Sequence, residues 1–256
     1  LVHLKRDQYI LQKKALHGAQ FMYLTKRGYM YINSKLLKVK DEQPLYVQKR
    51  YHTLRKSISE HSFMNFMFIW HYILTNPKQI TADTKIYEDS NMNQCKIPTY
   101  YAGRDVVVAP DTVILLPDPT SSIFQKALFV ENDTGRETYK QIYQKLVEYA
   151  VLAENGLAKN KLNEFTLYFI VPTKKRLKQL FYNPTGITSF FASYNNTRQV
   201  KDIRARTIVS SFSNPKITIY VSAFNPDNPK NPYVFEKYPL VELLLKEKPE
   251  WKVYLP

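Results

Sequence analysis

The stretch that decides the fold is Asp111-Thr-Val-Ile-Leu-Leu116, followed by a Pro-Asp-Pro turn and then Ala127-Leu-Phe-Val-Glu-Asn-Asp133. Both runs are apolar without polar alternation, which is typical of strands in a sheet that is covered on both faces. The turn at 117–120 predicts that the two strands are antiparallel neighbours. The first strand then begins beside the end of the second, so we expect Asp111 and Glu131 to meet at one edge of the sheet.

Upstream of these strands, apolar residues repeat at helical spacing from Leu54 to about Leu74, where Asn76-Pro77 ends the predicted helix. β-Branched and apolar runs predict four short strands, at 85–88, 104–108, 112–116 and 127–130. Residues 89–100 are polar, and we expect them to form a loop.

Downstream, a second helix is predicted to begin at Thr134, because Glu137 follows at capping-box spacing, and to end near Gly156. Strands are predicted at 165–171 and 216–221. They are separated by a basic helix that Thr173 caps and by a long loop at 183–215.

This order of elements predicts the α/β class: a mixed sheet formed by a helix, a three-strand meander, a second helix and a further strand. In front of it, alternating residues with a basic turn around Gly18 predict a two-stranded β-ribbon. A short helix is expected to start at Thr25. We expect three regions, at 1–50, 51–224 and 225–256, the last a C-terminal extension. Because residue 1 is Leu, we expect the chain to be a fragment.

The composition limits the function classes. The 256 residues include 37 Lys plus Arg and 22 Asp plus Glu, a formal charge of +15, which suits a polyanion such as nucleic acid. The six glycines are not clustered, which argues against a dinucleotide-binding or Walker-type loop. A single cysteine, Cys95, excludes an internal disulfide and disfavours a cysteine-based zinc site. With neither an apolar run of membrane-spanning length nor a visible signal peptide, we expect a cytoplasmic protein without a membrane partner.

Acidic residues gather where the two central strands meet. Asp133 lies two residues beyond Glu131, so it is expected on the same side of the strand, together with Asp111. Carboxylates in this arrangement suit Mg²⁺ or Mn²⁺, hard cations that can polarise a phosphate and help to generate hydroxide.

The helix that follows carries a polar stripe, because Gln141, Lys145 and Tyr149 recur at i, i+4 and i+8. Lys145 is expected to reach the carboxylates and to neutralise charge that develops on a phosphate.

The acidic pattern resembles the PD-(D/E)xK nuclease fold, which has the same order of helix, three-strand meander, helix and strand. Over roughly residues 1–172 the chain more narrowly resembles the replication-relaxation family of plasmids and other mobile elements. The matching segments are Tyr23-Leu-Thr-Lys-Arg-Gly28, the helix that holds His61, Glu88, Pro110-Asp111, Val130-Glu-Asn-Asp-Thr-Gly-Arg-Glu137 and Lys145-Leu-Val-Glu-Tyr149.

This resemblance implies a DNA-binding protein that acts in replication or DNA relaxation, with replication or transfer proteins as further partners. It also implies an N-terminal winged-helix module, of which residues 1–24 would be the wing.

The resemblance assigns roles as well. Asp111 and Glu131 would hold Mg²⁺ or Mn²⁺, and Lys145 would be the displaced form of the motif lysine, whose usual position holds Asp133. Other residues would support this site, as phosphate-orienting groups (Gln141 and Tyr149) or as accessory groups (His61 and Glu88).

The same residues allow plainer interpretations. Asp111 also fits a turn that follows a proline, and Glu131 and Asp133 fit an ordinary acidic strand end. Lys145 and Tyr149 fit a solvated helix face. His61 on an apolar face is also expected of a core histidine, and Glu88 of a solvent-facing strand end. A catalytically silent DNA binder, serving as a replication accessory factor or transcriptional regulator, has much the same residues. A third interpretation is an interaction scaffold that recruits a replication or transfer partner through aromatic residues of the tail such as Trp251 and Tyr254.

Basic residues in three segments are predicted to contact the phosphate backbone. They are Lys174, Lys175, Arg176 and Lys178 in the basic helix, Arg198, Lys201, Arg204 and Arg206 in the long loop, and Lys13 and Lys14 at the ribbon turn.

Overall fold

The computed structural model describes residues 10–14, 20–24, 60–88, 95–101, 103–183, 186, 187, 189, 203–225, 228 and 231–255. The chain forms two compact units, residues 1–63 and residues 64–256.

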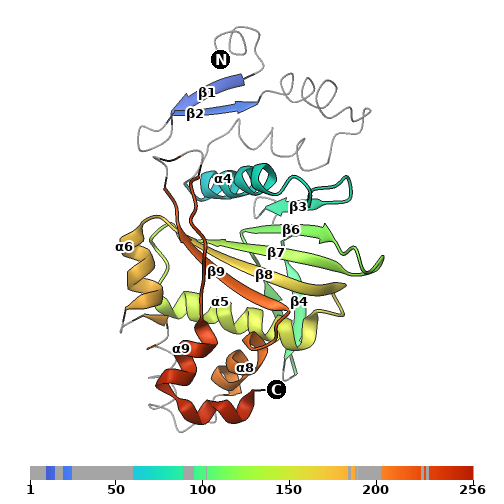
Figure 1. Cartoon of the computed structure of the whole chain (residues 1–256), viewed down its shortest axis with the longest axis vertical. Coiled ribbons are helices and arrows are strands. Elements are labelled where there is room, and N and C mark those ends of the chain that lie inside the picture. Colours follow the sequence, from blue (N-terminus) through green and yellow to red (C-terminus); the bar gives the residue numbers. More distant parts are fainter. Residues whose placement is uncertain are drawn as a thin grey trace. The chain divides into compact units, whose positions relative to one another are not determined.

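The larger unit is built on a six-stranded mixed sheet with the strand order β10-β9-β8-β7-β6-β3 (Figure 1). Its strands are β3 (Lys85–Glu88), β6 (Thr112–Pro117), β7 (Gln125–Asn132), β8 (Leu162–Val171), β9 (Ile217–Ala223) and β10 (Glu236–Lys237). The first three form an antiparallel meander, and β8 and β9 continue the sheet in parallel. The two-residue β10 pairs antiparallel with β9 at the edge.

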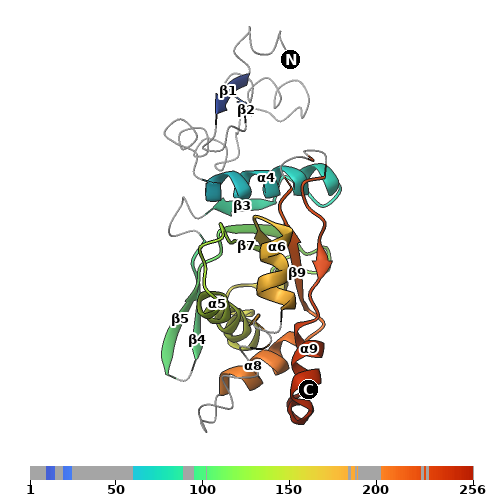
Figure 2. The ribbon, with the colours of Figure 1, turned by 90° about the vertical axis from the view of Figure 1, so that its left-hand side faces the viewer.

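Helices cover both faces of this sheet (Figures 1 and 2). Helix α4 (Glu60–Thr75) lies on one face, where Phe68 packs against Tyr168 with ring centroids 5.1 Å apart. The other face carries α5 (Tyr139–Val151) and α6 (Lys174–Leu177), with α8 (Ile203–Phe212) packed beside α5 and α9 (Leu240–Glu247) packed beside α8. The turns η3 (Leu152–Gly156), η4 (Lys178–Tyr182) and η5 (Pro249–Tyr254) follow α5, α6 and α9. The predicted α/β class and the two-sided cover of the sheet are confirmed.

The C-terminal residues belong to the core of the larger unit. The Tyr233 hydroxyl donates to the carbonyl of Met64 (3.3 Å), and the Phe235 ring contacts the Tyr168 ring at 4.9 Å. Further along, aromatic and leucine side chains are buried in the main core: Tyr238, Leu240, Leu244 and Trp251. The segment 225–256, expected as an extension, is therefore packed into the same unit as the sheet.

One predicted loop contains a strand. Strand β4 (Ile97–Tyr101) begins inside the predicted loop at 89–100 and ends one residue after it. It pairs antiparallel with β5 (Arg104–Val108) in a separate two-stranded sheet. The strand predicted at 104–108 is therefore not a member of the meander, whose first strand is β3. The sequence obscured β4 because Pro98 interrupts the run and only alternate residues are buried.

The predicted start of the second helix was wrong by one turn. Thr138 is the N-cap of α5: its side chain accepts from the Gln141 backbone N–H, and the Gln141 side chain accepts from the Thr138 N–H (2.7 Å). Thr134 lies in the preceding turn, where Gly135 has φ +89°, a conformation that ends helical geometry. Both threonines are followed by Glu or Gln three residues on, so the capping-box spacing did not distinguish them.

The predicted long loop at 183–215 contains helix α8 at its C-terminal end. Ile208, Val209 and Phe212 are buried in the core, and this contact stabilises a segment whose polar composition suggested a loop. Arg204 and Arg206 consequently lie in a helix.

The smaller unit contains the predicted β-ribbon. Strand β1 (Ile10–Lys14) pairs antiparallel with β2 (Gln20–Leu24), with Leu11 opposite Tyr23. Lys13 and Lys14 belong to the strand β1 and not to the turn. The helix predicted from Thr25 lies outside the described residues.

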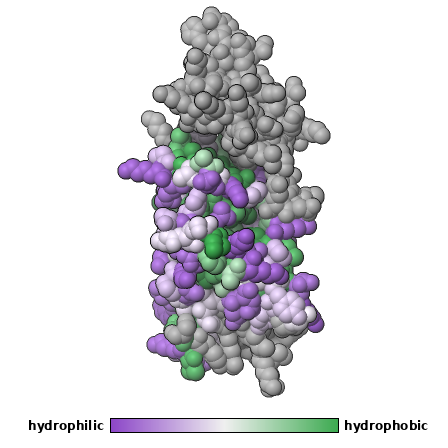
Figure 3. Space-filling view, turned by 90° about the vertical axis from the view of Figure 1, so that its right-hand side faces the viewer, coloured by the Kyte–Doolittle hydropathy of each residue, from purple (hydrophilic) through white to green (hydrophobic). Residues whose placement is uncertain are grey.

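The surface of the described part of the larger unit is mixed. Figure 3 shows hydrophobic side chains in small groups among hydrophilic ones on the face that it views. Large exposed hydrophobic residues include Trp70, Leu74 and Ile123. Within the described ranges, we find no helix with the length and apolar character needed to cross a membrane.

Replacing Thr138 with Ala should lower the free energy of unfolding by about 1 kcal/mol, because it removes an acceptor at the start of α5. Urea unfolding measures the change, and Thr134→Ala is the matched control in the preceding turn. Equal losses in the two variants would contradict the observed helix start.

Candidate functional site

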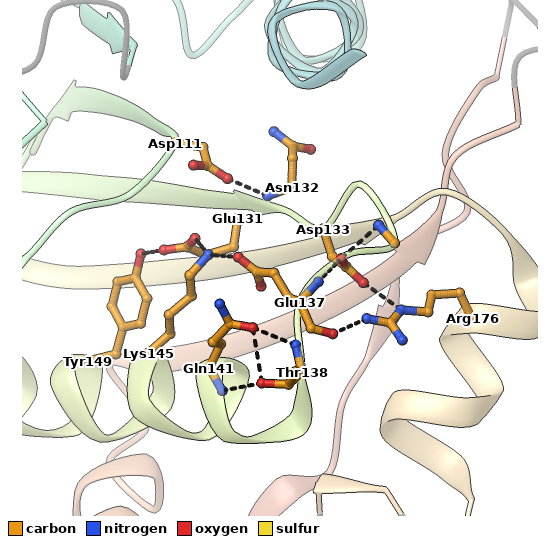
Figure 4. A network of polar contacts seen from close by, with 11 residues as sticks. Asp111, Glu131, Asn132, Asp133, Glu137, Thr138, Gln141, Lys145, Tyr149 and Arg176 are labelled. Atoms are coloured by element: carbon orange, nitrogen blue, oxygen red, sulfur yellow. Dashed lines mark hydrogen bonds and ion pairs between the residues drawn. The ribbon is translucent and has the colours of Figure 1, made fainter. Parts of the chain in front are cut away.

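The start of β6 and the end of β7 lie side by side, as the antiparallel pairing predicted. The Asp111 N–H donates to the carbonyl of Val130 (3.0 Å), and the Asn132 N–H donates to Asp111 Oδ2 (2.6 Å). Asp111 is therefore held where strand β6 begins and strand β7 ends, directly beside Glu131. Its carboxylate lies next to the β7 backbone in Figure 4.

Glu131 points from β7 toward α5 and binds two side chains of that helix (Figure 4). Its Oε2 lies 2.7 Å from Lys145 Nζ, and its Oε1 accepts a hydrogen bond of 2.6 Å from the Tyr149 hydroxyl. The spacing of four residues places Lys145 and Tyr149 on one face of α5, one turn apart. The Glu131 side chain is 3% exposed and that of Lys145 is 23% exposed, so the carboxylate is almost fully removed from solvent while its lysine partner keeps some access to it.

Lys145 also binds a second carboxylate, at 2.5 Å from Glu137 Oε1. Burial raises the pKa of Glu131 to about 8, and Asp111 adds to this rise while Lys145 opposes it. Burial alone would lower the pKa of Lys145, but the carboxylates of Glu131, Asp111 and Glu137 raise it well above its usual range. Three carboxylates thus surround one ammonium group, and a proton or a divalent cation can balance the excess negative charge.

Asp133 lies on the same side of β7 as Glu131, as predicted, but it binds other partners. Its Oδ2 lies 2.7 Å from Arg176 Nε, and its Oδ1 accepts from the backbone N–H groups of Gly135 (2.7 Å) and Glu137 (3.2 Å). Arg176 donates as well to the carbonyl of Glu137. Asp133 therefore anchors the loop between β7 and α5 and ties this loop to α6.

Asn132 lies between these two acidic residues and points to the opposite face of the sheet, toward α4 (Figure 4). Its Nδ2 donates to Asn65 Oδ1, and Asn65 Nδ2 donates to the Asp111 carbonyl at 3.3 Å. These bonds connect α4 to both strand ends.

The two predicted accessory residues come from α4 and β3. Glu88 ends β3 opposite Thr112, and the register directs both side chains to the α4 face, away from Lys145. Glu88 is 1% exposed, so it is not a solvent-facing strand end. His61 is half-buried in α4, one turn before Asn65.

The two residues predicted to orient a phosphate have contacts within the protein. Tyr149 is fully buried, and burial raises its pKa well above the usual range, so its hydroxyl remains a donor to Glu131. Without exposed surface, Tyr149 positions Glu131 and does not reach an external phosphate. Gln141 is exposed, and its side chain closes the capping box with Thr138.

The predicted phosphate-binding cations differ in their surroundings. In the segment that Thr173 caps, Lys174, Lys175 and Lys178 are exposed, whereas Arg176 is largely occupied by Asp133 and Glu137. Several others lie outside the described residues (Arg198 and Lys201) or are described only by their backbone (Lys13, Lys14, Arg204 and Arg206).

The carboxylate oxygens of Asp111 and Glu131 are donors of the kind that Mg²⁺ prefers. In the part of the chain that the structure describes, no three His, Cys, Asp or Glu side chains converge as a complete metal cage. Mg²⁺ is commonly bound by one or two carboxylates together with waters and substrate phosphates, so this pair is chemically suited to it.

Comparison of the chain with models of known protein families and with curated proteins gives no match. The residues above are therefore interpreted from their geometry and chemistry.

Two contributors to this site are not evident from the sequence. The spacing of Glu137 indicates a helix cap, although its side chain binds Lys145, and Arg176 stands in a run with three exposed lysines, although it pairs with Asp133. Nothing in a basic run such as Lys174–Lys178 marks the one cation that turns inward, because a packing partner from another element selects it.

A raised pKa in the folded state means that Glu131 stabilises the fold below about pH 4.5 and that this contribution is lost as the pH rises through about 8. We therefore expect the stability of Glu131→Gln, relative to the wild type, to increase between about pH 5 and about pH 8. Chemical unfolding across this range measures the difference. The same trend in Glu164→Gln, at an exposed carboxylate paired with Lys126, would contradict the assignment to Glu131.

Replacing Arg176 with Met leaves the Asp133 carboxylate, 2% exposed, without its charged partner. We expect a loss of about 3 kcal/mol or more in the free energy of unfolding. The control Lys126→Met breaks the exposed pair with Glu164 and should cost less than about 1 kcal/mol. Similar losses in both variants would show that the buried pair contributes no more to the free energy of unfolding than the exposed pair does.

Proposed function

We propose that the chain is a DNA-binding protein of a plasmid or other mobile element, acting in replication or DNA relaxation, and that its α/β core nicks DNA with Mg²⁺. The observation that carries this proposal is the Glu131–Lys145 pair, 2.7 Å apart, beside Asp111 at the edge of the sheet. In metal-dependent phosphodiester cleavage, carboxylates bind the metal ion and an ammonium group stabilises the negative charge that develops on the phosphate.

The topology supports a PD-(D/E)xK-like core. Apart from the β4–β5 hairpin inserted between β3 and β6, helix α4, the meander β3-β6-β7, helix α5 and the parallel strand β8 come in the order expected for that fold. Asp111 stands at the start of the second strand of the meander and Glu131 near the end of the third. In this proposal Lys145, on the helix that follows, has the role of a displaced motif lysine.

In this proposal Asp111 and Glu131 hold Mg²⁺, which, when bound, polarises a phosphate and lowers the pKa of a water ligand. Lys145 neutralises negative charge that develops on the phosphate. Tyr149 orients Glu131 through its 2.6 Å hydrogen bond, and Glu137 holds Lys145 in place.

Two features outside the site support DNA as the partner. The formal charge of +15 favours a polyanion. The ribbon β1–β2 has the two-stranded form expected of the wing of a winged-helix module.

A catalytically silent DNA binder is the second candidate. The observation in its favour is that protein groups already occupy both carboxylate oxygens of Glu131 and both of Asp133. Such a protein would bind DNA with a steep negative salt dependence and without a metal requirement.

Conversion of supercoiled plasmid to open circles in Mg²⁺ or Mn²⁺ tests the proposal. The wild type should nick, and Asp111→Asn and Glu131→Gln should each lower the rate by about 100-fold or more, because loss of even an outer-shell partner of a metal ligand costs about 10- to 100-fold. Lys145→Gln should have a similar effect, with partial recovery in Lys145→Arg.

Glu164→Gln is the matched control and should keep the wild-type rate, because its carboxylate pairs with Lys126 on the surface. Thermal unfolding confirms that each variant is folded. Absence of nicking by the wild type with either metal, combined with metal-independent DNA binding, would replace the nuclease with the silent binder.

A further inference from the structure

We propose that a ridge of exposed cations beside the Glu131–Lys145 pair binds the phosphate backbone of double-stranded DNA; this inference rests on the proposed function. The cationic ridge consists of Arg136, Lys140, Lys174, Lys175 and Lys178. Arg136 lies in the loop before α5 and Lys140 in the first turn of that helix, and neither was among the predicted phosphate-binding residues.

The two segments that form the ridge are held together by specific bonds. Arg176 in α6 donates to the Glu137 carbonyl and pairs with Asp133 at 2.7 Å. The Tyr139 hydroxyl donates to the carbonyl of Gln179 at 3.1 Å. Tyr139 adjoins Lys140 and Gln179 adjoins Lys178, so these contacts hold the two cation-bearing segments against one another. The elements concerned lie side by side in Figure 2.

The carboxylates of the ridge segments do not cancel its charge. Asp133 is buried against Arg176, and Glu137 is half-buried against Lys145. Asp133 thus has Arg176 as its own cation, Glu137 shares Lys145 with Glu131, and all five ridge residues are exposed. The charged pairs of Asp133 and Glu137 thus lie beneath the surface, and the ridge cations lie on it. Clustered exposed cations attract phosphates.

The composition of the ridge favours backbone contact over base stacking. Of the aromatic residues next to the ridge, Tyr139 is half-buried with its hydroxyl bound to Gln179. Tyr182 is 44% exposed, but its hydroxyl donates to Glu236 and its ring contacts the Tyr238 ring edge-on, so neither ring is a free platform for a base. Lysines on rigid helical segments match phosphates at fixed positions along a duplex.

The ridge is also connected to the candidate site. Glu137 accepts from Arg176 through its backbone carbonyl and binds Lys145 through its side chain, and Lys145 in turn binds Glu131. A phosphate backbone held on the ridge therefore lies beside the loop that positions Lys145. This continuity supports the ridge as the surface that delivers DNA to the site.

Fluorescence anisotropy with a labelled duplex of mixed sequence, without divalent metal and at several NaCl concentrations, tests the ridge. Lys140→Gln, Lys174→Gln and Lys175→Gln should each weaken binding similarly for unrelated sequences. Each should reduce the slope of log Kobs against log salt by about 0.9, the value for one lost phosphate contact. The triple variant should lose more than two units of slope.

Lys159→Gln and Lys246→Gln remove the same charge from exposed positions after η3 and on α9, and they should leave the slope unchanged. Equal effects in these controls and in the ridge variants would overturn the ridge. A wild type that nicks plasmid while ridge variants bind normally would overturn the ridge alone. Ridge-dependent binding without nicking would support the ridge and overturn only the nuclease, and no duplex binding at all would overturn both.

Discussion

The buried Glu131–Lys145 ion pair is the constraint on which the arrangement of this edge of the protein depends. A carboxylate with almost no exposed surface is costly unless its oxygens are bound, and here an ammonium group and a tyrosine hydroxyl bind them. Both partners project from α5, so the pair sets the position of this helix on β7. Because Asp111 and Glu137 add further negative charge, the cluster is poised to take up a proton or a cation.

The loop between β7 and α5 extends this network of charged side chains to a second helix, α6. Asp133 closes the turn through the N–H of Gly135 and holds Arg176 of α6, while Glu137 connects Arg176 with Lys145. The sheet and two helices are thus joined by inward-pointing charges. Among the described residues of these segments, Lys140, Lys174, Lys175 and Lys178 remain exposed, so inward-pointing and outward-pointing cations lie close together in the chain.

Much of the core could be predicted because continuous apolar runs and turn residues are local signals. The strands around Val113 and Phe129, their antiparallel pairing and the approach of Asp111 to Glu131 followed from these signals. Errors arose where two local patterns compete or where burial overrides composition. Thr134 and Thr138 have the same capping spacing, and Gly135, with its positive φ, decides between them.

The amino-acid order by itself determined the α/β class, the positive charge and the meeting of two acidic residues at one sheet edge, since strand polarity and side-chain alternation follow from neighbouring residues. Only the tertiary structure decided which charges pair. It turned Arg176 inward to Asp133, joined Glu137 to Lys145 and placed Glu88 on the opposite face. The physical reason is that the free energy of a charge depends on its burial and on partners from distant elements, which no local spacing encodes.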